Sequence, residues 1–312
     1  MTGPSVAVLC GGVGAARFLD GLLAVTAPEN VTAVVNTGDD LVLHGLHISP
    51  DLDTITYTLA GQVDRDRGWG LVGESWQAMA TLARYGGEDW FNLGDRDLGT
   101  HLYRTQRLHD GAPLSEVTGE IVRAWDLLLR VLPVTDDPLR TKVTVAGEGE
   151  IDFQEYFVHR RHQPAVTAVR FEGAERTRPA PGVLGALRDA DVVVVAPSNP
   201  IVSIDPLLAV PGVRSALADR REGVVAVSPI VGGSALKGPA AELLEALGHE
   251  SSVVGIARLY ADLAATLVFD TTDADRADEV LEAGMRPVAT DTIMTTPEVR
   301  AALAGTVLRA AR

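Results

Sequence analysis

Residues 6–14 read Val6-Ala7-Val8-Leu9-Cys10-Gly11-Gly12-Val13-Gly14, a short apolar run that ends in a glycine-rich loop. An amphipathic helical pattern follows, and a second apolar run extends from Val31 to Val35. This order of strand, loop, helix and strand is typical of the start of a doubly wound α/β sheet. Because the apolar runs are continuous rather than alternating, we expect parallel strands with helices covering both faces.

The same pattern returns near the other end of the chain. Four apolar runs are candidate strands, at 191–196, 223–227, 252–254 and 286–289. Helical patterns accompany them around 206–219, 238–247 and 297–311. The sequence therefore predicts a Rossmann-like, doubly wound, mostly parallel sheet of the α/β class.

The middle of the chain has a different composition. Residues 54–130 are mostly helical in pattern and hold all four tryptophans, and two β-rich runs follow at 141–145 and 151–157. Tryptophans are more often core residues, yet their confinement to one segment also suits a pocket for a flat aromatic ligand. We interpret residues 1–312 as one unit, with a sheet core from about 1–60 and 176–312 and a largely helical inserted cap over about 61–175.

The composition excludes several classes of protein. The 312 residues include 27 Lys and Arg against 42 Asp and Glu, which gives a formal charge of −15. This charge disfavours binding to nucleic acid or to an anionic membrane. A single cysteine, Cys10, excludes a disulfide framework and a cysteine-based zinc site. With neither a signal-peptide pattern nor a long apolar run, we expect a cytoplasmic protein.

The glycine loop is a candidate phosphate site. Backbone N–H groups of Gly11, Gly12, Val13 and Gly14 can approach a phosphate at the start of a helix. A Walker loop and a dinucleotide fingerprint both fail, because Arg17 and Asn36 stand where those motifs need other residues. The alternative is a tight strand-to-helix turn that binds no ligand.

Pairs of aspartates follow the first strands. Asp39 and Asp40 come after the second strand, and Asp51 and Asp53 lie where a helix is expected to begin. Such carboxylates suit Mg²⁺, and one of them can instead accept a proton from an attacking hydroxyl. Helix capping by Asp53 is the structural alternative.

Further polar residues lie at expected loops. The segment with Asn92, Asp95 and Arg96 is either a substrate loop or a helix-capping cluster, and Ser198, Asn199 and Ser228 end two expected buried strands. These last residues can present hydroxyl and amide groups to a nucleotide, and simple turn chemistry is the alternative.

Several motifs together resemble one known family, over nearly the whole chain. They are Cys10–Arg17 (CGGVGAAR), Asn36–Asp40 (NTGDD), Ile48–Thr54 (ISPDLDT), Gly68–Gly70 (GWG), Leu93–Leu98 (LGDRDL), Ala196–Pro200 (APSNP) and Val227–Ile230 (VSPI). The chain is similar to the CofD/FbiA group, the phospholactate or phosphoenolpyruvate transferases of coenzyme F-420 biosynthesis. The amino-acid sequences of these motifs look closest to those of the actinobacterial FbiA branch.

The resemblance implies a chemistry. The acceptor would be the deazaflavin Fo, whose terminal ribityl hydroxyl attacks the phosphorus of a guanosine diphosphate ester of enolpyruvate or lactate. GMP leaves, and dehydro-F-420-0 or F-420-0 forms. The family also implies Mg²⁺ and a homodimer. The sequence leaves open whether the donor carries enolpyruvate or lactate.

The same resemblance implies residue roles. The glycine loop (Gly11, Gly12, Val13, Gly14) would bind the donor's phosphates, with Asn36 beside it. Asp39 and Asp53 would contact the metal, and Asp51, or Asp53 if the metal takes Asp51, would orient the hydroxyl. Asn92, Asp95 and Arg96 would line the Fo pocket, and Ser198, Asn199 and Ser228 would hold the guanosine part.

Two alternatives remain open. YvcK-like regulators of the same fold family bind a UDP-sugar without known turnover and share the glycine loop. A nucleotide-sugar transferase with another acceptor is the third hypothesis. The tryptophan-bearing segment with its Gly-Asp-Arg-Asp run argues against the regulator, because a sensor needs no acceptor pocket.

Overall fold

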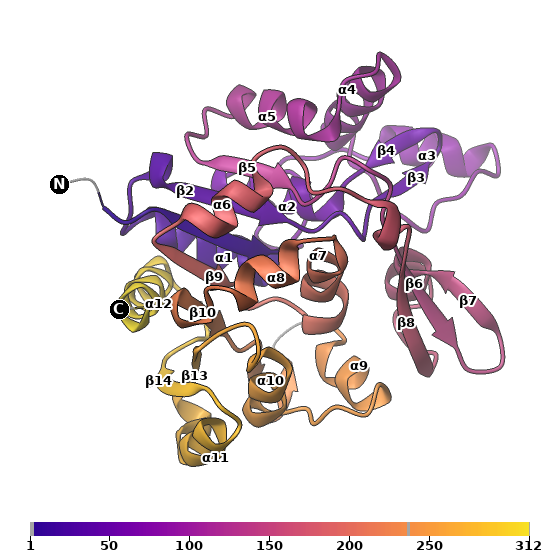
Figure 1. The fold of residues 1–312 in the computed structure, drawn as a ribbon. Helices are drawn as coiled ribbons and strands as arrows, with labels where there is room; N and C mark the ends of the chain where they lie inside the picture. The colour runs from indigo at the N-terminus through magenta and orange to yellow at the C-terminus, as the bar shows by residue number, and fades with distance from the viewer. Residues whose placement is uncertain (1–2, 236–237, 312) are drawn as a thin grey trace.

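One seven-stranded sheet forms the centre of the molecule. The computed structural model describes residues 3–235 and 238–311 (Figure 1). The strand order is β14-β13-β10-β9-β1-β2-β5, and neighbouring strands all run parallel. The strands are β1 (Val6–Cys10), β2 (Val31–Val35), β5 (Arg130–Pro133), β9 (Val192–Val195), β10 (Val224–Val227), β13 (Thr266–Asp270) and β14 (Arg286–Thr290).

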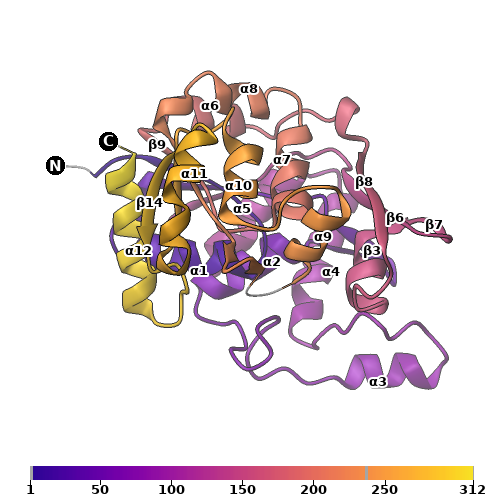
Figure 2. The same ribbon diagram turned by 90° about the horizontal axis from the view of Figure 1, so that it is seen from below.

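Helices cover both faces of this sheet (Figures 1 and 2). Alternate strand residues enter two separate cores, so that Val8 belongs to one and Leu9 to the other. The core that contains Val8 includes residues of α1 (Gly12–Leu23), α2 (Pro50–Leu59), α5 (Leu114–Ala124) and α12 (Pro297–Ala310). The core that contains Leu9 includes residues of α6 (Val183–Asp189), α7 (Asp205–Ala209), α8 (Val213–Ala218), α9 (Ala240–Ala246), α10 (Val253–Tyr260) and α11 (Ala277–Glu282).

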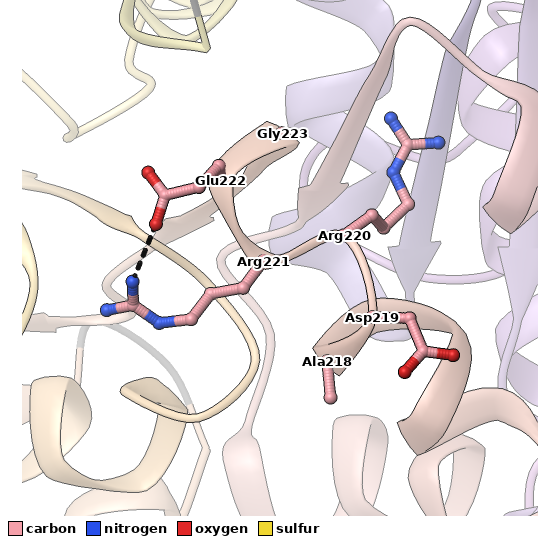
Figure 3. A pocket seen from close by; sticks show the side chains of 6 residues that line it. All are labelled: Ala218, Asp219, Arg220, Arg221, Glu222 and Gly223. Carbon is pink, nitrogen blue, oxygen red and sulfur yellow. Dashed lines mark hydrogen bonds and ion pairs between the residues drawn. The ribbon is translucent and has the colours of Figure 1, made fainter.

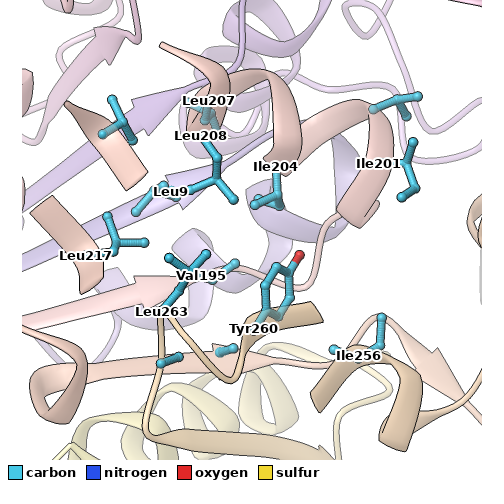
Figure 4. Packing of buried hydrophobic residues seen from close by; sticks show 14 of the residues in the cluster. Leu9, Val195, Ile201, Ile204, Leu207, Leu208, Leu217, Ile256, Tyr260 and Leu263 are labelled. Atoms are coloured by element: carbon cyan, nitrogen blue, oxygen red, sulfur yellow. The ribbon is translucent and has the colours of Figure 1, made fainter. Parts of the chain in front are cut away.

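Figure 4 shows part of the second core. Leu9 and Val195 project from the sheet toward Ile204, Leu208 and Tyr260 of the covering segments. Burial of continuous apolar strands on both faces confirms the predicted α/β class and the parallel sheet.

The chain changes direction across the sheet at β1. This strand pairs with β2 on one side and with β9 on the other, although β9 lies far along the chain. Such a topological switch point opens a crevice at the carboxyl ends of the strands, where α/β proteins bind ligands. The glycine loop follows β1 directly and therefore lies at this crevice.

Three excursions leave the sheet. The first is the hairpin β3 (Leu41–Leu43) and β4 (Leu46–Ile48), and the second contains α3 (Gln77–Arg84) and α4 (Asp97–His109). The third is an antiparallel sheet of β7 (Gly149–Asp152), β6 (Arg140–Val145) and β8 (Val166–Glu172), which extends to the side of the molecule in Figure 1. Within the expected cap of 61–175, β5 returns to the main sheet as its edge strand.

Some expected elements differ from the structure. The strand predicted at 252–254 is wrong, because Ser252 caps α10 by accepting a hydrogen bond from the Gly255 amide at 3.1 Å. The structure has a strand at Thr266–Asp270, β13, where the sequence pattern predicts none. The helix expected over 206–219 is two helices, α7 and α8, separated by a turn in which Gly212 has φ of 89°.

Within the β-rich run at 151–157, only the first residues form a strand. The pairing of β7 ends at Asp152, and Glu155–His159 form a short π-helix instead. A small antiparallel pair, β11 (Ile230–Val231) and β12 (Ser234–Ala235), follows β10. Among the described residues, no helix has the length and apolar character needed to cross a membrane.

Candidate active site

Asp51 lies at the centre of the crevice and joins two loops. Its Oδ1 accepts a hydrogen bond from the Gly12 amide at 2.8 Å, and its Oδ2 accepts one from Asn36 Nδ2 at 2.9 Å. Asn36 Nδ2 also donates to the Val202 carbonyl at 3.2 Å, and the Gly11 amide donates to Ser198 Oγ at 3.4 Å. The loops after β1, β2 and β9 therefore meet at this carboxylate.

The glycines of the loop are required by close packing. A Cβ atom at Gly11 would lie 2.6 Å from Asp51 Oδ2 and 2.9 Å from Ser203 Cβ. Gly12 has φ of +73°, a conformation that disfavours other residues. A Cβ at Gly14 would collide with the Pro197 carbonyl. Side-chain contacts at Gly11, a positive φ at Gly12 and a backbone contact at Gly14 thus explain the three glycines of the loop.

Asp39 and Asp51 are both buried, and the charge of Asp51 acts on Asp39; the two are called the carboxylate pair. Burial raises the pKa of Asp51 to about 6, although hydrogen bonds from Asn36 and Gly12 oppose the shift. Burial, with the neighbouring charge of Asp51, raises the pKa of Asp39 well above its ordinary value. Asp39 Oδ1 is buried without a hydrogen-bond partner within residues 3–235 and 238–311.

This pair fits a divalent cation. Mg²⁺ binds carboxylate oxygens, and a double positive charge would offset the repulsion between two buried carboxylates. It would also give the unpartnered oxygen of Asp39 a ligand. The donor set is therefore chemically suited to the metal that the sequence predicts.

Asp53 points away from this pair. Both of its oxygens accept hydrogen bonds from the buried Arg104 guanidinium, with Nη1 3.1 Å from Oδ2. Asp53, Asp97 and His101 also place one potential ligand atom each within 4.8 Å of one another. However, Arg104 Nη1 lies 3.4 Å from His101 Nδ1, so its positive charge occupies the region where a cation would bind.

Three other predicted residues, Asn199, Ser228 and Asp95, make hydrogen bonds within nearby turns and helix starts. Asn199 Oδ1 accepts from the Ile201 and Val202 amides, and Ser228 Oγ accepts from the Ile230 amide at 3.1 Å. Asp95 accepts from the Gln77 and Ala78 amides at the start of α3, so it caps this earlier helix and not the helix that follows it in the sequence. Turn and cap chemistry thus accounts for these three side chains.

Two other predicted residues lie outside the crevice network. Asn92 and Arg96 are exposed on the segment before α4. The Arg96 guanidinium donates to the Val72 carbonyl. The backbone amide of Arg96 donates to Glu74 Oε2 at 2.7 Å. This segment is therefore held to the residues that precede α3.

A third carboxyl group, that of Asp40, is also buried and follows Asp39 in the chain. It accepts a hydrogen bond from Ser49 Oγ at 2.8 Å, and burial raises its pKa to about 7. It lines a cavity of about 180 Å³ together with Thr37, His47 and Arg140. Burial, followed by the charge of Arg104, lowers the pKa of His47 to about 4, so this side chain is neutral near pH 7.

A larger hollow of about 480 Å³ lies elsewhere (Figure 3). Residues 218–223 line it, and Arg221 Nη1 pairs there with Glu222 Oε1 at 3.0 Å. These residues precede β10, so the hollow lies at the amino end of that strand, whereas the crevice lies at the carboxyl ends. None of the residues discussed above lines it.

The chain matches the protein family described as 2-phospho-L-lactate transferase CofD over residues 6–307. It belongs to the CofD family. This family contains the phosphoenolpyruvate and phospholactate transferases of coenzyme F-420 biosynthesis, so the protein is a transferase of this type. The predicted resemblance is confirmed.

Individual CofD-family relatives are similar over almost their whole length. A phosphoenolpyruvate transferase of Streptomyces griseus subsp. griseus is 45% identical, over 98% of this chain and 98% of that protein. One from Mycobacterium bovis BCG is 43% identical, over 97% of this chain and 99% of that protein.

A solved structure is similar in fold. Protein BH3568 from Bacillus halodurans has a TM-score of 0.65 and 17% identity over 98% of this chain and 99% of that one.

Sequence reasoning missed a buried network beside the CofD-family motifs. It consists of Tyr57, Asp97, His101 and Arg104, in contact with Asp53. The signal was present, because Asp97, His101 and Arg104 have the spacing i, i+4 and i+7 that places them on one face of a helix. Without the structure, however, nothing connects that face to Asp53.

Proposed function

We propose that this protein transfers a phosphoenolpyruvyl group from a guanosine diphosphate-activated donor to the terminal ribityl hydroxyl of Fo. The hydroxyl oxygen bonds to the phosphorus that carries the enolpyruvyl group, the bond from that phosphorus to the GMP oxygen breaks, and the hydroxyl proton is lost. The products are GMP and dehydro-F-420-0. The same chemistry with a lactyl donor would give F-420-0. The high identity to phosphoenolpyruvate transferases favours the first donor.

The observation that carries this proposal is the position of Asp51. It links the glycine loop to Asn36, and its charge acts on Asp39, whose buried Oδ1 has no hydrogen-bond partner among the described residues. Phosphoryl transfer depends mainly on positioning and on neutralisation of charge. A glycine loop at the start of a helix, next to carboxylates that suit a cation, would supply both requirements at one place.

We assign Asp39 and Asp51 to Mg²⁺, which would neutralise the phosphate charge when bound. Asp53 was the sequence-based choice, but its two oxygens are already held by Arg104. In this assignment Asn36 holds the Asp51 carboxylate in orientation through its amide at 2.9 Å. Asp51 would then act as a metal ligand, and this assignment leaves no separate carboxylate for the attacking hydroxyl.

The glycine loop would bind the donor's phosphates. Gly12 already donates its amide to Asp51, whereas Val13 and Gly14 lie in the first turn of α1, where amides lack intrahelical acceptors. Ser198 beside Gly11 would contact the guanosine part. Fo would bind against the segment that carries Asn92 and Arg96, which is exposed and stabilised by the caps of α3 and α4.

The first experiment is a fluorescence titration of Fo into the purified protein with Mg²⁺ and GDP. A parallel titration uses UDP-N-acetylglucosamine as the control ligand. Saturable Fo binding, followed by formation of dehydro-F-420-0 with the enolpyruvyl donor in mass spectrometry, is the expected result. Tight binding of the UDP-sugar without Fo binding would overturn the proposal in favour of a regulator.

We also propose that the protein forms a homodimer, as the family resemblance implies. Size-exclusion chromatography with light scattering tests this directly. The expected mass is twice the 33.0 kDa of one chain. A mass equal to one chain at micromolar concentration would contradict the dimer without affecting the proposed reaction.

A further inference from the structure

Arg104 holds the segment that carries Asp51 on both sides. Its guanidinium donates to both oxygens of Asp53 and, through Nη1, to the His47 carbonyl at 3.4 Å. His47 precedes Asp51 by four residues, and Asp53 follows it by two. The arginine is 1% exposed although it extends from the distant helix α4. One buried side chain therefore fixes both ends of a short segment in the active site.

The first turn of α2 is held from two directions. Residues two positions apart on a helix point about 200° apart, so Asp51 and Asp53 face opposite ways. Asp51 bonds to the glycine loop and to Asn36, whereas Asp53 bonds to Arg104. Any rotation or shift of α2 that breaks the Arg104 contacts must also move the Asp51 carboxylate.

The groups around Arg104 extend this support into α4. His101 lies between two carboxylates, with Nδ1 3.7 Å from Asp53 Oδ2 and Nε2 3.3 Å from Asp97 Oδ2. The Tyr57 hydroxyl, from the last half of α2, donates to Asp97 Oδ1 at 2.6 Å. Two points along α2 are thus tied to α4 by polar contacts in a buried layer.

A buried network of charged groups adds little net stability to a folded protein. Removing charged groups from water is costly, and apolar side chains of similar size often stabilise a protein as well or better. What directional hydrogen bonds add is a fixed orientation. An orientation requirement explains why this particular layer, next to Asp51, contains an arginine, a histidine and two aspartates.

We propose that Arg104 is a positioning residue for the transfer reaction, which sets the Asp51 carboxylate through Asp53 and the His47 carbonyl. The role assigned to Asp51 rests on the proposed function. Arg104 touches neither substrate in this scheme. It acts by restricting the first turn of α2, and a misplacement of about 1 Å at a reacting group can cost about 100-fold in rate.

The test compares three variants with the wild-type protein. Arg104→Lys keeps the buried charge but cannot make the two-pronged contact with Asp53. Arg104→Gln removes the charge. Arg107→Gln is the matched control on the same helix, because Arg107 pairs with Glu116 and Glu120 near the surface. Steady-state kinetics with both substrates give kcat and KM, and Fo fluorescence gives Kd.

We expect kcat to fall about 10-fold for Arg104→Lys and about 100-fold for Arg104→Gln, with the Kd for Fo changed less than about 3-fold. Arg107→Gln should behave as wild type. Hydrogen exchange followed by mass spectrometry should show faster exchange in peptides covering residues 48–58 of the Arg104 variants only. This second measurement does not depend on the reaction.

Folding is controlled with the double variant Asp53→Asn/Arg104→Gln, which removes the charge of Arg104 together with that of its bidentate partner. It should be folded yet remain about as slow as Arg104→Gln. If Arg104→Lys has wild-type kcat and wild-type exchange, or if the folded double variant has wild-type kcat, Arg104 has no positioning role and the inference is wrong. A failure of the proposed function is distinguishable, because the wild-type protein itself would then neither bind Fo nor form product.

Discussion

The carboxylate of Asp51 accepts a hydrogen bond from the backbone amide of Gly12 at 2.8 Å, although 39 positions separate the two residues. The contact joins the start of α2 to the start of α1. It places a buried acid group directly against the turn that is expected to bind phosphate. The conformation of Gly12 and the charge of Asp51 are therefore parts of one arrangement, and each can be tested.

Replacement of Gly12 by alanine should weaken donor binding more than Fo binding. Gly12 has φ of +73°, so alanine would strain the turn that presents its amide to Asp51. The strain is about 1–2 kcal/mol. The matched control is Gly61→Ala, because Gly61 has φ of +67° and open space around its Cβ position.

The two variants should lose similar thermal stability, since both force alanine into the same backbone region. Only Gly12→Ala should raise the KM for the guanosine diphosphate-activated donor, by about 10-fold or more. Isothermal titration with GDP and Fo fluorescence measure the two affinities separately. A larger loss of Fo affinity than of GDP affinity would place the phosphates elsewhere.

The sequence predicted the residues that lie at the crevice because strand and loop signals are local. Each of β1, β2, β9 and β10 is a continuous apolar run, and each is followed by small or polar residues. Parallel strands bring these loops to one edge of the sheet. Gly11, Gly12, Asn36 and Ser198 could therefore be brought together without coordinates, whereas Asp51 lies in α2 and joins them from outside the sheet.

The partner of Asp53 could not be predicted in this way. Arg104 lies 51 positions further along the chain, on a helix outside the sheet, and no short-range pattern connects the two. Similarly, Thr266–Asp270 follows the apolar residues Leu263–Ala265 without a clear break, which hides the start of β13. Ser252 was assigned to a strand because the two valines after it favour β-structure, yet as a helix cap it places them in α10.

Substitution of Ser252 by alanine should lower stability without affecting the reaction. Ser252 Oγ accepts the Gly255 amide at 3.1 Å, and loss of such a cap costs about 1 kcal/mol. For a chain of this length the melting temperature should fall by about 1.5 °C. Ser251→Ala is the control, since the Ser251 hydroxyl donates to the Gly233 carbonyl and caps no helix among the described residues. A change in kcat for Ser252→Ala would contradict a purely local role.

The stability of the metal-free protein should decrease between pH 6.5 and pH 8. The folded-state pKa of Asp40 is about 7 and that of Asp51 is about 6, both raised by burial above the ordinary value of 3.8. The folded protein therefore binds protons in this range that the unfolded chain has already lost. Stability falls as the pH rises, by up to about 1.4 kcal/mol per pH unit for each such proton.

Thermal melts in EDTA at the two pH values measure this effect. Below pH 6.5, His47 works in the opposite direction, because its lowered pKa favours protonation of the unfolded chain. The comparison is therefore confined to the upper range. Asp40→Asn should reduce the slope, whereas a slope of zero in the wild-type protein would show that these carboxyl groups are not protonated in the folded state.

The variant Asp39→Asn should reveal two effects of the carboxylate pair. These are its destabilisation of the metal-free protein and its contribution to Mg²⁺ binding. Asp39 is buried beside Asp51, and its Oδ1 lacks a hydrogen-bond partner among the described residues. Without metal, loss of one charge should raise the melting temperature at pH 8, because it removes repulsion within the pair. With Mg²⁺, the wild-type protein should gain stability by mass action and the variant should gain much less.

The same substitution should lower kcat at least about 100-fold, because charge neutralisation at the phosphates is a large part of catalysis in phosphoryl transfer. Asp66→Asn is the control, since Asp66 is exposed on the surface. A variant that is more stable without metal, unresponsive to Mg²⁺ and inactive would assign the metal to Asp39. If Asp39→Asn still responds to Mg²⁺ as wild type does, the cation binds elsewhere, and the Asp53, Asp97 and His101 group becomes the alternative.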